Sequence, residues 1–248
     1  MKNIEYTLMA KLYDQFYASK NYEKEVNFIT NFVHNKDCNI LDAGCGTGNH
    51  AQLLHNLGYN VHGFDLNIDM VNIANSKLQN KFEVGNILNF TTNKKYDVII
   101  SFFAVFNHLK SYKEFKKALS NLSKILKNDG CLIIDLHNPQ KNGTKKDIIN
   151  NSTRIMKWRV SKIFKKEFTQ ITYVIDQKIF KTRHVFKTFK IDKLRKIANK
   201  LGFQQIQFYE NYNIDSTATQ KSKNLQMILQ KNKNNKNKIF YLYHEVKL

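Results

Sequence analysis

Hydrophobic residues recur along the first 135 positions in two patterns, one helical and one extended. Over residues 22–34 they return every three or four positions, which predicts an amphipathic helix. Short apolar runs then predict strands, each followed by a helix, near residues 39–43, 60–65, 81–85 and 96–103. The helix after the fourth strand is expected to stop at Gly130, where a fifth strand begins.

Alternating strands and helices of this length predict an α/β fold with a parallel sheet, whose ligands bind at the carboxyl ends of the strands. After Pro139 the pattern changes. Short alternating runs within residues 152–190 predict antiparallel strands, inserted over the open end of the sheet. A last helix, with Asp192 as its N-cap and Gly202 at its end, is expected before two final strands near 205–209 and 225–229.

A glycine-rich turn joins the first strand to its helix. Gly44, Gly46 and Gly48 alternate there within residues 41–48. Alternate glycines let the backbone adopt positive φ and let a ligand approach without meeting Cβ atoms, and the helix that follows offers free N–H groups. The turn is therefore expected to bind a ligand.

Asp65 indicates what kind of ligand this is. It ends the next apolar strand, about twenty residues after the turn, where a carboxylate can accept both hydroxyls of a ribose. The turn reads G-x-G-x-G and not G-x-G-x-x-G, and Asp42 beside it suits an ammonium group better than a diphosphate. A P-loop pattern is absent from the sequence. The residues favour a nucleoside-containing cofactor.

Several stretches resemble the class I S-adenosylmethionine-dependent methyltransferases. Residues 41–48 resemble the first motif of that family, residues 64–70 the second and residues 82–87 the third. The resemblance covers about residues 6–230. It implies a Rossmann-like, seven-stranded methyltransferase sheet flanked by helices, with the final two strands antiparallel and the β insertion acting as a substrate lid. It also implies methyl transfer from S-adenosylmethionine, with S-adenosylhomocysteine as the product.

The resemblance also implies a set of donor-binding positions. Asp65 would hold the ribose and Met70 would lie near the adenine, while Asp42 would order the loop or reach the amino group of the donor. Asn86 stands where the family usually has an aspartate, and its side-chain carbonyl can still accept from the adenine amino group. The expected set, which includes no metal ligand, is Tyr13, Tyr22, Asp42, Ala43, Gly44, Gly46, Gly48, Asp65, Leu66, Met70, Asn86, Ile87 and Phe102.

The aromatic segment 12–22 resembles the tyrosine-rich lid of small-molecule methyltransferases, in particular the nucleotide-linked amino-sugar N-methyltransferases. By this resemblance Tyr13 would contact the sulfonium or the acceptor, and Tyr22 the carboxylate of the donor. Packing of the tyrosines against the domain is the alternative interpretation.

His108, in the loop after the fourth strand, matches a histidine that lies beside the reacting amine in that branch. An imidazole titrates near neutrality and suits a base, so Tyr13 and His108 are the catalytic candidates. A helix cap or a surface imidazole is the alternative for His108. His137 after the fifth strand and His184 in the insertion are weaker candidates for the acceptor side.

Charge and composition change this picture little. The net charge of +20 raises the prospect of a nucleic-acid partner, but the excess is nearly all lysine, spread along the chain beside abundant asparagine. The three cysteines lack metal-ligand spacing, and neither a run of about 18 apolar residues nor a signal-peptide core is present. We expect a cytoplasmic protein with a small-molecule acceptor and no membrane or nucleic-acid partner; a homodimer stays open.

Four parts are expected along the chain: an N-terminal helical lid (1–38), a donor-binding core (39–139 with 191–230), the antiparallel β insertion on the acceptor side (140–190), and a basic linker with a tail (231–248). The leading functional prediction is methyl transfer to a small molecule, namely the amino group of a nucleotide-linked amino sugar. Two alternatives remain open. One is an RNA methyltransferase, supported only by charge, and the other is a donor-binding regulator without activity.

Overall fold

The computed structural model describes residues 10, 12–33, 35–139, 141–149 and 152–231. Its elements are, in chain order, α2 (Tyr22–Thr30), β1 (Asn39–Ala43), α3 (Asn49–Asn56), β2 (Asn60–Asp65), α4 (Ile68–Lys77), β3 (Phe82–Val84), β4 (Tyr96–Ser101), η1 (Val105–His108), α5 (Tyr112–Ile125), β5 (Leu126–His137), β6 (Gly143–Ile149), β7 (Ser152–Ser161), β8 (Lys166–Ile175), β9 (Lys178–Lys187), α6 (Ile191–Lys200), β10 (Gln205–Glu210), β11 (Asn213–Thr217) and β12 (Asn224–Gln230).

The larger sheet has the strand order β11-β10-β12-β5-β4-β1-β2-β3. Strands β1 to β5 pair in parallel, and β12 lies antiparallel between β5 and β10. The predicted seven-stranded sheet with antiparallel final strands is confirmed. It is extended by one edge strand, β11, which the sequence did not predict.

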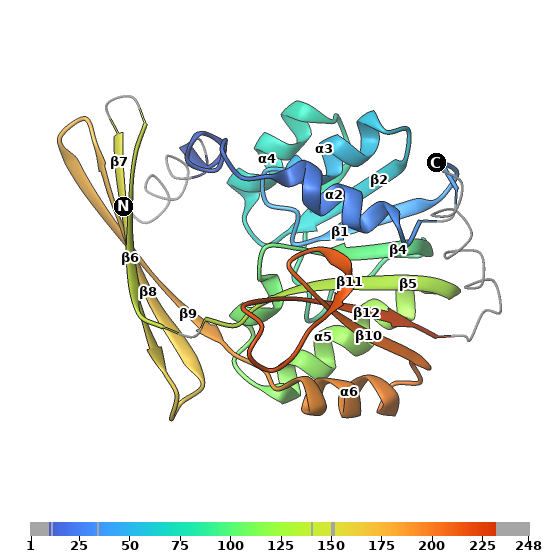
Figure 1. Cartoon of the computed structure of the whole chain (residues 1–248). Coiled ribbons are helices and arrows are strands. Elements are labelled where there is room, and N and C mark those ends of the chain that lie inside the picture. The colour runs from blue at the N-terminus through green and yellow to red at the C-terminus, as the bar shows by residue number, and fades with distance from the viewer. Residues whose placement is uncertain (1–9, 11, 34, 140, 150–151, 232–248) are drawn as a thin grey trace, which may run out of the picture.

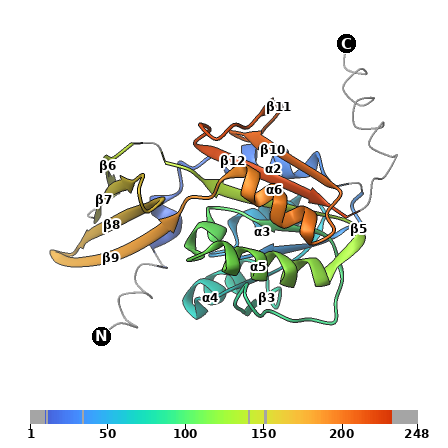
Figure 2. The same cartoon turned by 90° about the horizontal axis from the view of Figure 1, so that it is seen from below.

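Helices cover both faces of this sheet, with α2, α3 and α4 on one face and α5 and α6 on the other (Figures 1 and 2). Helix α5 shows why the hydrophobic pattern of its sequence predicted a helix. Its buried residues recur at helical spacing, and Ser111 caps its first turn by accepting from the Glu114 N–H at 3.1 Å. Two apolar clusters, one on each side of the sheet, form the core.

Three local predictions were wrong. No helix follows β3 among the described residues, because the Asn86 carbonyl accepts from Asn89 and Phe90 in a single turn of an asparagine-rich stretch. Gly130 does not stop α5, since β5 already begins at Leu126. Glycine is needed there because a Cβ would lie 2.9 Å from the Asp97 carbonyl oxygen.

The last helix also starts earlier than expected. Lys190 is the N-cap of α6, and Asp192 lies in the first turn, where its charge favours the positive end of the helix. Gly202, with φ of +85°, follows the end of the helix as predicted.

The second sheet is an antiparallel meander with the order β6-β7-β8-β9. Figure 1 shows it beside the larger sheet, next to the carboxyl end of β5. The predicted antiparallel insertion is confirmed, although β6, a polar edge strand, was not foreseen. Its inner face packs Ile171, Tyr173 and Ile175 against Phe16 of the N-terminal segment.

No helix within the described ranges combines the length and the apolar character that crossing a membrane requires. Residues 1–9 of the predicted lid and residues 232–248 of the predicted linker and tail lie outside the described residues.

Candidate functional site

The glycine turn after β1 has the geometry that the sequence predicts. Gly44, Gly46 and Gly48 have φ values of +86°, +55° and +80°. A Cβ on Gly44 would lie 2.6 Å from the Val105 side chain, so glycine lets η1 approach the turn. A Cβ on Gly46 would meet nothing within 4 Å. The turn therefore presents bare backbone to open space.

Asp65 is held beside this turn by two backbone donors. Its Oδ2 accepts from the Gly46 N–H at 2.9 Å and its Oδ1 from the Asn67 N–H at 2.9 Å. A carboxylate has about four lone-pair sites, so both oxygens retain capacity for the two hydroxyls of a ribose. Burial raises the pKa of Asp65, and the backbone hydrogen bonds oppose that rise.

Asp42 lies beneath the turn and is almost completely buried. Its Oδ2 has no hydrogen-bond partner among the described residues. Burial, followed by repulsion from Asp65, raises the pKa of Asp42 to about 8. A buried acceptor without a partner is costly, and an ammonium group at this position would satisfy it. The site therefore fits a ligand that carries a ribose and an amino group.

The N-terminal segment is tied to the glycine turn by Asp14. Its carboxylate accepts from Thr47 Oγ1 at 2.5 Å, from Asn49 Nδ2 at 3.0 Å and from Lys77 Nζ at 2.6 Å. The sequence did not predict these hydrogen bonds, since their donors belong to the turn, α3 and α4. This anchor brings the aromatic segment 12–22 over the expected donor site.

Tyr13 and Tyr22 both lie at this site. The Tyr13 ring is 4.6 Å from that of Tyr17 and 6.2 Å, edge-on, from that of Phe103, which follows β4. Burial raises the pKa of Tyr13 well above its usual value, with smaller effects from Tyr17, Tyr22, Asp65 and Asp14. Its hydroxyl therefore stays protonated near the Asp65 carboxylate.

Tyr22 closes the other side of the turn. Its ring lies 5.0 Å from that of His50, whose ring is 5.3 Å from that of Phe102. His50 Nε2 and Glu25 Oε2 are 2.5 Å apart, and Glu25 also pairs with Lys20. Burial raises the pKa of Tyr22 to about 12. The predicted positions Tyr22 and Phe102 thus share one buried cluster.

Exposed apolar side chains mark the carboxyl ends of neighbouring strands. Leu66 after β2 is 70% exposed, Val84 at the end of β3 is 51% exposed and Phe103 after β4 is 39% exposed. Met70 is half-buried and Ile87 is buried beside them. Apolar groups left open along one edge suit a flat base. Asn86 Oδ1 already accepts from the Leu88 N–H at 2.9 Å, which leaves it one lone pair.

The chain leaves β4 in a strained conformation. Phe103 and Ala104 have φ values of +63° and +61°, although neither is glycine. The Asp135 carboxylate of β5 stabilises this turn by accepting from the Phe103 N–H at 3.1 Å. Backbone strain that neighbouring groups hold in place is common at functional sites. Asp135 itself lies buried behind the site.

His108 lies at the far end of η1, against the second sheet. Its ring is 4.6 Å from that of Phe186 and 6.0 Å from that of His184. Although the residue keeps solvent-exposed surface, partial burial of the ring, followed by repulsion from His184, lowers the pKa of His108 to about 4. The imidazole is neutral at pH 7 and a weaker base than an ordinary histidine. No described contact links it to Tyr13.

Sequence reasoning missed two further buried residues, Asn107 and Arg154. Asn107 is buried and joins η1 to β5 and β9 by donating to the carbonyls of His137 and Lys187 at 2.8 and 2.7 Å. Arg154 is buried on β7, where it pairs with Asp147 at 2.6 Å and lies 4.4 Å from the Tyr17 ring centre. Long-range contacts define both roles, so their own stretches of sequence carried no signal.

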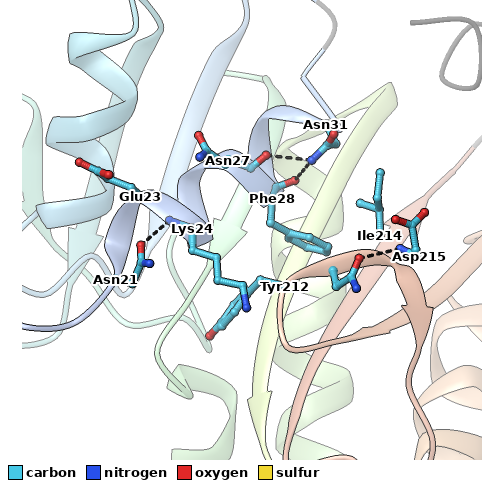
Figure 3. A pocket seen from close by; sticks show the side chains of 10 residues that line it. Asn21, Glu23, Lys24, Asn27, Phe28, Asn31, Tyr212, Ile214 and Asp215 are labelled. Atoms are coloured by element: carbon cyan, nitrogen blue, oxygen red, sulfur yellow. Dashed lines mark hydrogen bonds between the residues drawn. The ribbon is translucent and has the colours of Figure 1, made fainter. Parts of the chain in front are cut away.

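A surface hollow of about 420 Å³ lies apart from these groups, between α2 and the turn before β11 (Figure 3). The amides of Asn21, Asn31 and Asn213 that line it already bond to nearby backbone. Of the predicted site residues, none lines it. The hollow is therefore separate from the candidate site.

Known proteins resemble this chain at the levels of sequence and fold. A family model described as a methyltransferase domain matches residues 34–184. An uncharacterized protein of Methanocaldococcus jannaschii is 32% identical over 206 residues, which cover 81% of this chain and 75% of that protein.

A dTDP-3-amino-3,4,6-trideoxy-α-D-glucopyranose N,N-dimethyltransferase of Streptomyces venezuelae is 26% identical over 132 residues, covering 51% of this chain and 56% of that enzyme. The crystal structure of an S-adenosylmethionine-dependent methyltransferase from Clostridium acetobutylicum has the same fold, with a TM-score of 0.77, 20% identity, and coverage of 91% of this chain and 98% of that one. Because the family model matches more than half of the chain, the chain belongs to the methyltransferase domain family and is an S-adenosylmethionine-dependent methyltransferase.

Proposed function

We propose that this enzyme methylates the amino group of a nucleotide-linked amino sugar. The observation that carries the proposal is the arrangement of the donor turn. It faces an aromatic lid and, beyond η1, the part of the second sheet's inner face that carries Glu167, Thr169 and His184. When bound, S-adenosylmethionine supplies a methyl group activated by a positively charged sulfur. The protein binds the donor and the acceptor and orients them for transfer.

On the donor side, we assign Asp65 to the ribose hydroxyls, Asp42 to the donor's ammonium group and the Gly46 backbone to close approach. Tyr13 and Phe103 place aromatic rings where they can steady a positive sulfur, an effect worth about 0.5–2 kcal/mol. Tyr22 is assigned to the donor's carboxylate. The unpaired Oδ2 of Asp42 supports this orientation of the donor.

On the acceptor side, the inner face of the second sheet carries Glu167, Thr169 and His184, opposite His108 on η1. These groups can bind a polar acceptor through hydrogen bonds. The Streptomyces venezuelae relative is named for methylation of an amino sugar linked to dTDP. That name supports an acceptor of this class for the present enzyme.

The test uses the purified full chain, S-adenosylmethionine and dTDP-3-amino-3,4,6-trideoxy-α-D-glucopyranose, called the amino-sugar probe below. We expect release of S-adenosylhomocysteine and a methylated probe by mass spectrometry. Gly46→Val should abolish donor binding in calorimetry, because a side chain would fill the space open to the ligand. His108→Ala should lower turnover and leave donor affinity nearly unchanged. Donor binding without probe methylation would contradict the proposed acceptor.

One observation favours a second candidate, an RNA methyltransferase. The outer face of the second sheet exposes Lys146, Lys157, Arg159, Lys181 and Arg183. Within the described part of the chain these five cations form no ion pair with a carboxylate. Unpaired cations on one face suit a phosphate backbone. Methylation of transfer RNA in the same assay, with the amino-sugar probe unchanged, would favour this candidate.

A further inference from the structure

A buried carboxylate faces the core from the second sheet. Glu167 on β8 is 4% exposed. Its carboxylate accepts from the Thr169 hydroxyl and lies 3.2 Å from His137 Nε2, and it pairs with no lysine or arginine among the described residues. Arg154, the buried cation of the same face, is already paired with Asp147. A buried charge is costly unless it is paired, so Glu167 is balanced best when His137 carries a proton.

His137 is fixed from its backbone as well as from its ring. Asn107 Oδ1 accepts from the His137 N–H at 2.8 Å, while Asn107 Nδ2 donates to the His137 carbonyl at 2.8 Å. The side chain remains 39% exposed. Since Nε2 faces the Glu167 carboxylate, the proton of the neutral ring belongs on Nε2, which leaves the lone pair on Nδ1. This nitrogen has no hydrogen bond within the described structure.

The location of His137 matches the acceptor half of the site. It ends β5, which pairs in parallel with β4, while the donor turn and Asp65 follow β1 and β2. Asp135, two residues earlier on β5, holds the strained turn at Phe103. In sheets of this kind the ligand lies across the carboxyl ends where the strand order reverses, here between β1 and β4. His137 is therefore one strand beyond the donor.

His108 lacks these features. Its ring contacts Phe186 and His184, and no carboxylate pairs with it among the described residues. A neutral imidazole in such surroundings can accept a hydrogen bond from the acceptor but gains little from taking a proton. The two histidines thus differ in their surroundings, because a carboxylate faces His137 and none is paired with His108 among the described residues.

We infer that His137 is the base of the reaction and that Glu167 is its positioning residue. The inference rests on the proposed amine acceptor. The protonated amine gives one proton to His137 Nδ1, and its freed lone pair forms the N–C bond as the C–S bond breaks. The sulfur leaves as a neutral thioether. Glu167 stabilises the imidazolium until the proton passes to water, and one proton is released for each methyl group transferred.

The first test is kinetic. His137→Gln should lower kcat for the amino-sugar probe by about 10²–10⁴-fold, with donor affinity by calorimetry unchanged, and Glu167→Gln should show a smaller loss. His55→Gln, a surface change on α3, serves as the matched control. The deficit of His137→Gln should shrink at high pH, where the amine loses its proton unaided. A deficit that is constant with pH, or a wild-type rate, would overturn the inference.

The second test does not depend on the acceptor. ¹⁵N NMR of histidine-labelled protein in complex with S-adenosylhomocysteine should show the His137 proton on Nε2, with the signal assigned by its loss in His137→Gln. Glu167→Gln should change this tautomer balance, whereas His55→Gln should not. If the wild type fails to methylate the probe but the NMR result holds, the acceptor assignment fails and the histidine–carboxylate pair stands. A proton on Nδ1 would overturn the pair itself.

Discussion

Asp42 is a buried acid that we assign to the donor's ammonium group. Its Oδ2 lacks a partner among the described residues, and burial with repulsion from Asp65 raises its pKa to about 8. The carboxyl group is therefore mostly protonated at pH 7. An ammonium group beside it would favour the carboxylate and lower this pKa. The proposed assignment of Asp42 would thus couple donor binding to proton release at this side chain.

We predict that donor binding at pH 7 releases close to one proton, because the carboxyl group loses its proton when the ammonium group arrives. Calorimetry in two buffers with different ionisation enthalpies measures this release. Asp42→Asn should bind the donor more weakly and release no proton. Equal proton release by the wild type and Asp42→Asn would contradict the assignment of Asp42 to the ammonium group.

The same residue gives the donor-free protein a defined pH dependence. Since the folded-state pKa lies above that of the unfolded chain, the folded state binds the extra proton, and stability falls as pH rises from about 4 toward 8. Asp42→Asn should flatten this slope in urea unfolding.

Residues whose role is local could be predicted from sequence, and residues whose role depends on distant partners could not. The turn glycines and Asp65 were identified as candidates by their spacing alone. Asp14 acquires its role through Thr47, Asn49 and Lys77, which are 33, 35 and 63 positions away. Glu167 likewise needs His137, 30 positions earlier.

At the scale of elements, the Asp14 carboxylate attaches the N-terminal segment to the glycine turn and to helices α3 and α4. Burial alone would raise the pKa of Asp14, but hydrogen bonds from Lys77, Thr47 and Asn49 outweigh it and lower the pKa. The attachment is therefore fully formed at pH values above the ordinary pKa of an aspartate. It is lost as the pH falls through the lowered pKa of Asp14. The lid should loosen in acid.

We predict that Asp14→Asn speeds donor dissociation roughly fivefold at pH 7. Hydrogen bonds to a charged group are worth about 1.5–3 kcal/mol, and partial exposure of Asp14 to solvent reduces this to about 1 kcal/mol. Stopped-flow displacement of the donor by excess S-adenosylhomocysteine measures the rate. Glu23→Gln, which removes a carboxylate of α2 without an ion pair among the described residues, is the control. Equal rates for wild type and Asp14→Asn would contradict this role of the anchor.

Whole elements were predictable where one face is buried. Strands β1 and β2 and helix α5 bury regular apolar patterns, so the sequence located them closely. Strands β6 and β11 lie at sheet edges with mostly exposed or half-buried side chains and so lack such a pattern. The segment after β3 shows the opposite error, since its apolar residues were expected in a helix and pack instead from turns.

At the scale of the whole molecule, the net charge of +20 makes the salt dependence of activity a test of the acceptor class. A nucleotide-linked sugar carries two phosphates, so kcat/KM for the amino-sugar probe should fall about tenfold or less between 50 and 200 mM salt. Engagement of the five outer-face cations with an RNA backbone would cost several hundred-fold over the same range.

Parallel assays with the probe and with transfer RNA measure this difference. Lys157→Gln/Arg183→Gln, a double change on the outer face, should leave probe methylation unchanged. A steep salt dependence for a methylated RNA, reduced by this double change, would contradict the small-molecule assignment.

The place of β12 in the larger sheet has a consequence for biosynthesis. This strand, the last in the described chain, fills the gap between β5 and β10 with seven paired positions on the β5 side alone. Until residue 230 has left the ribosome, β5 exposes an unsatisfied edge and the apolar residues meant to lie beneath Met227 and Leu229 remain in water. A nascent chain that stalls before β12 has emerged is therefore aggregation-prone, although strands β1 to β5 have already been synthesised.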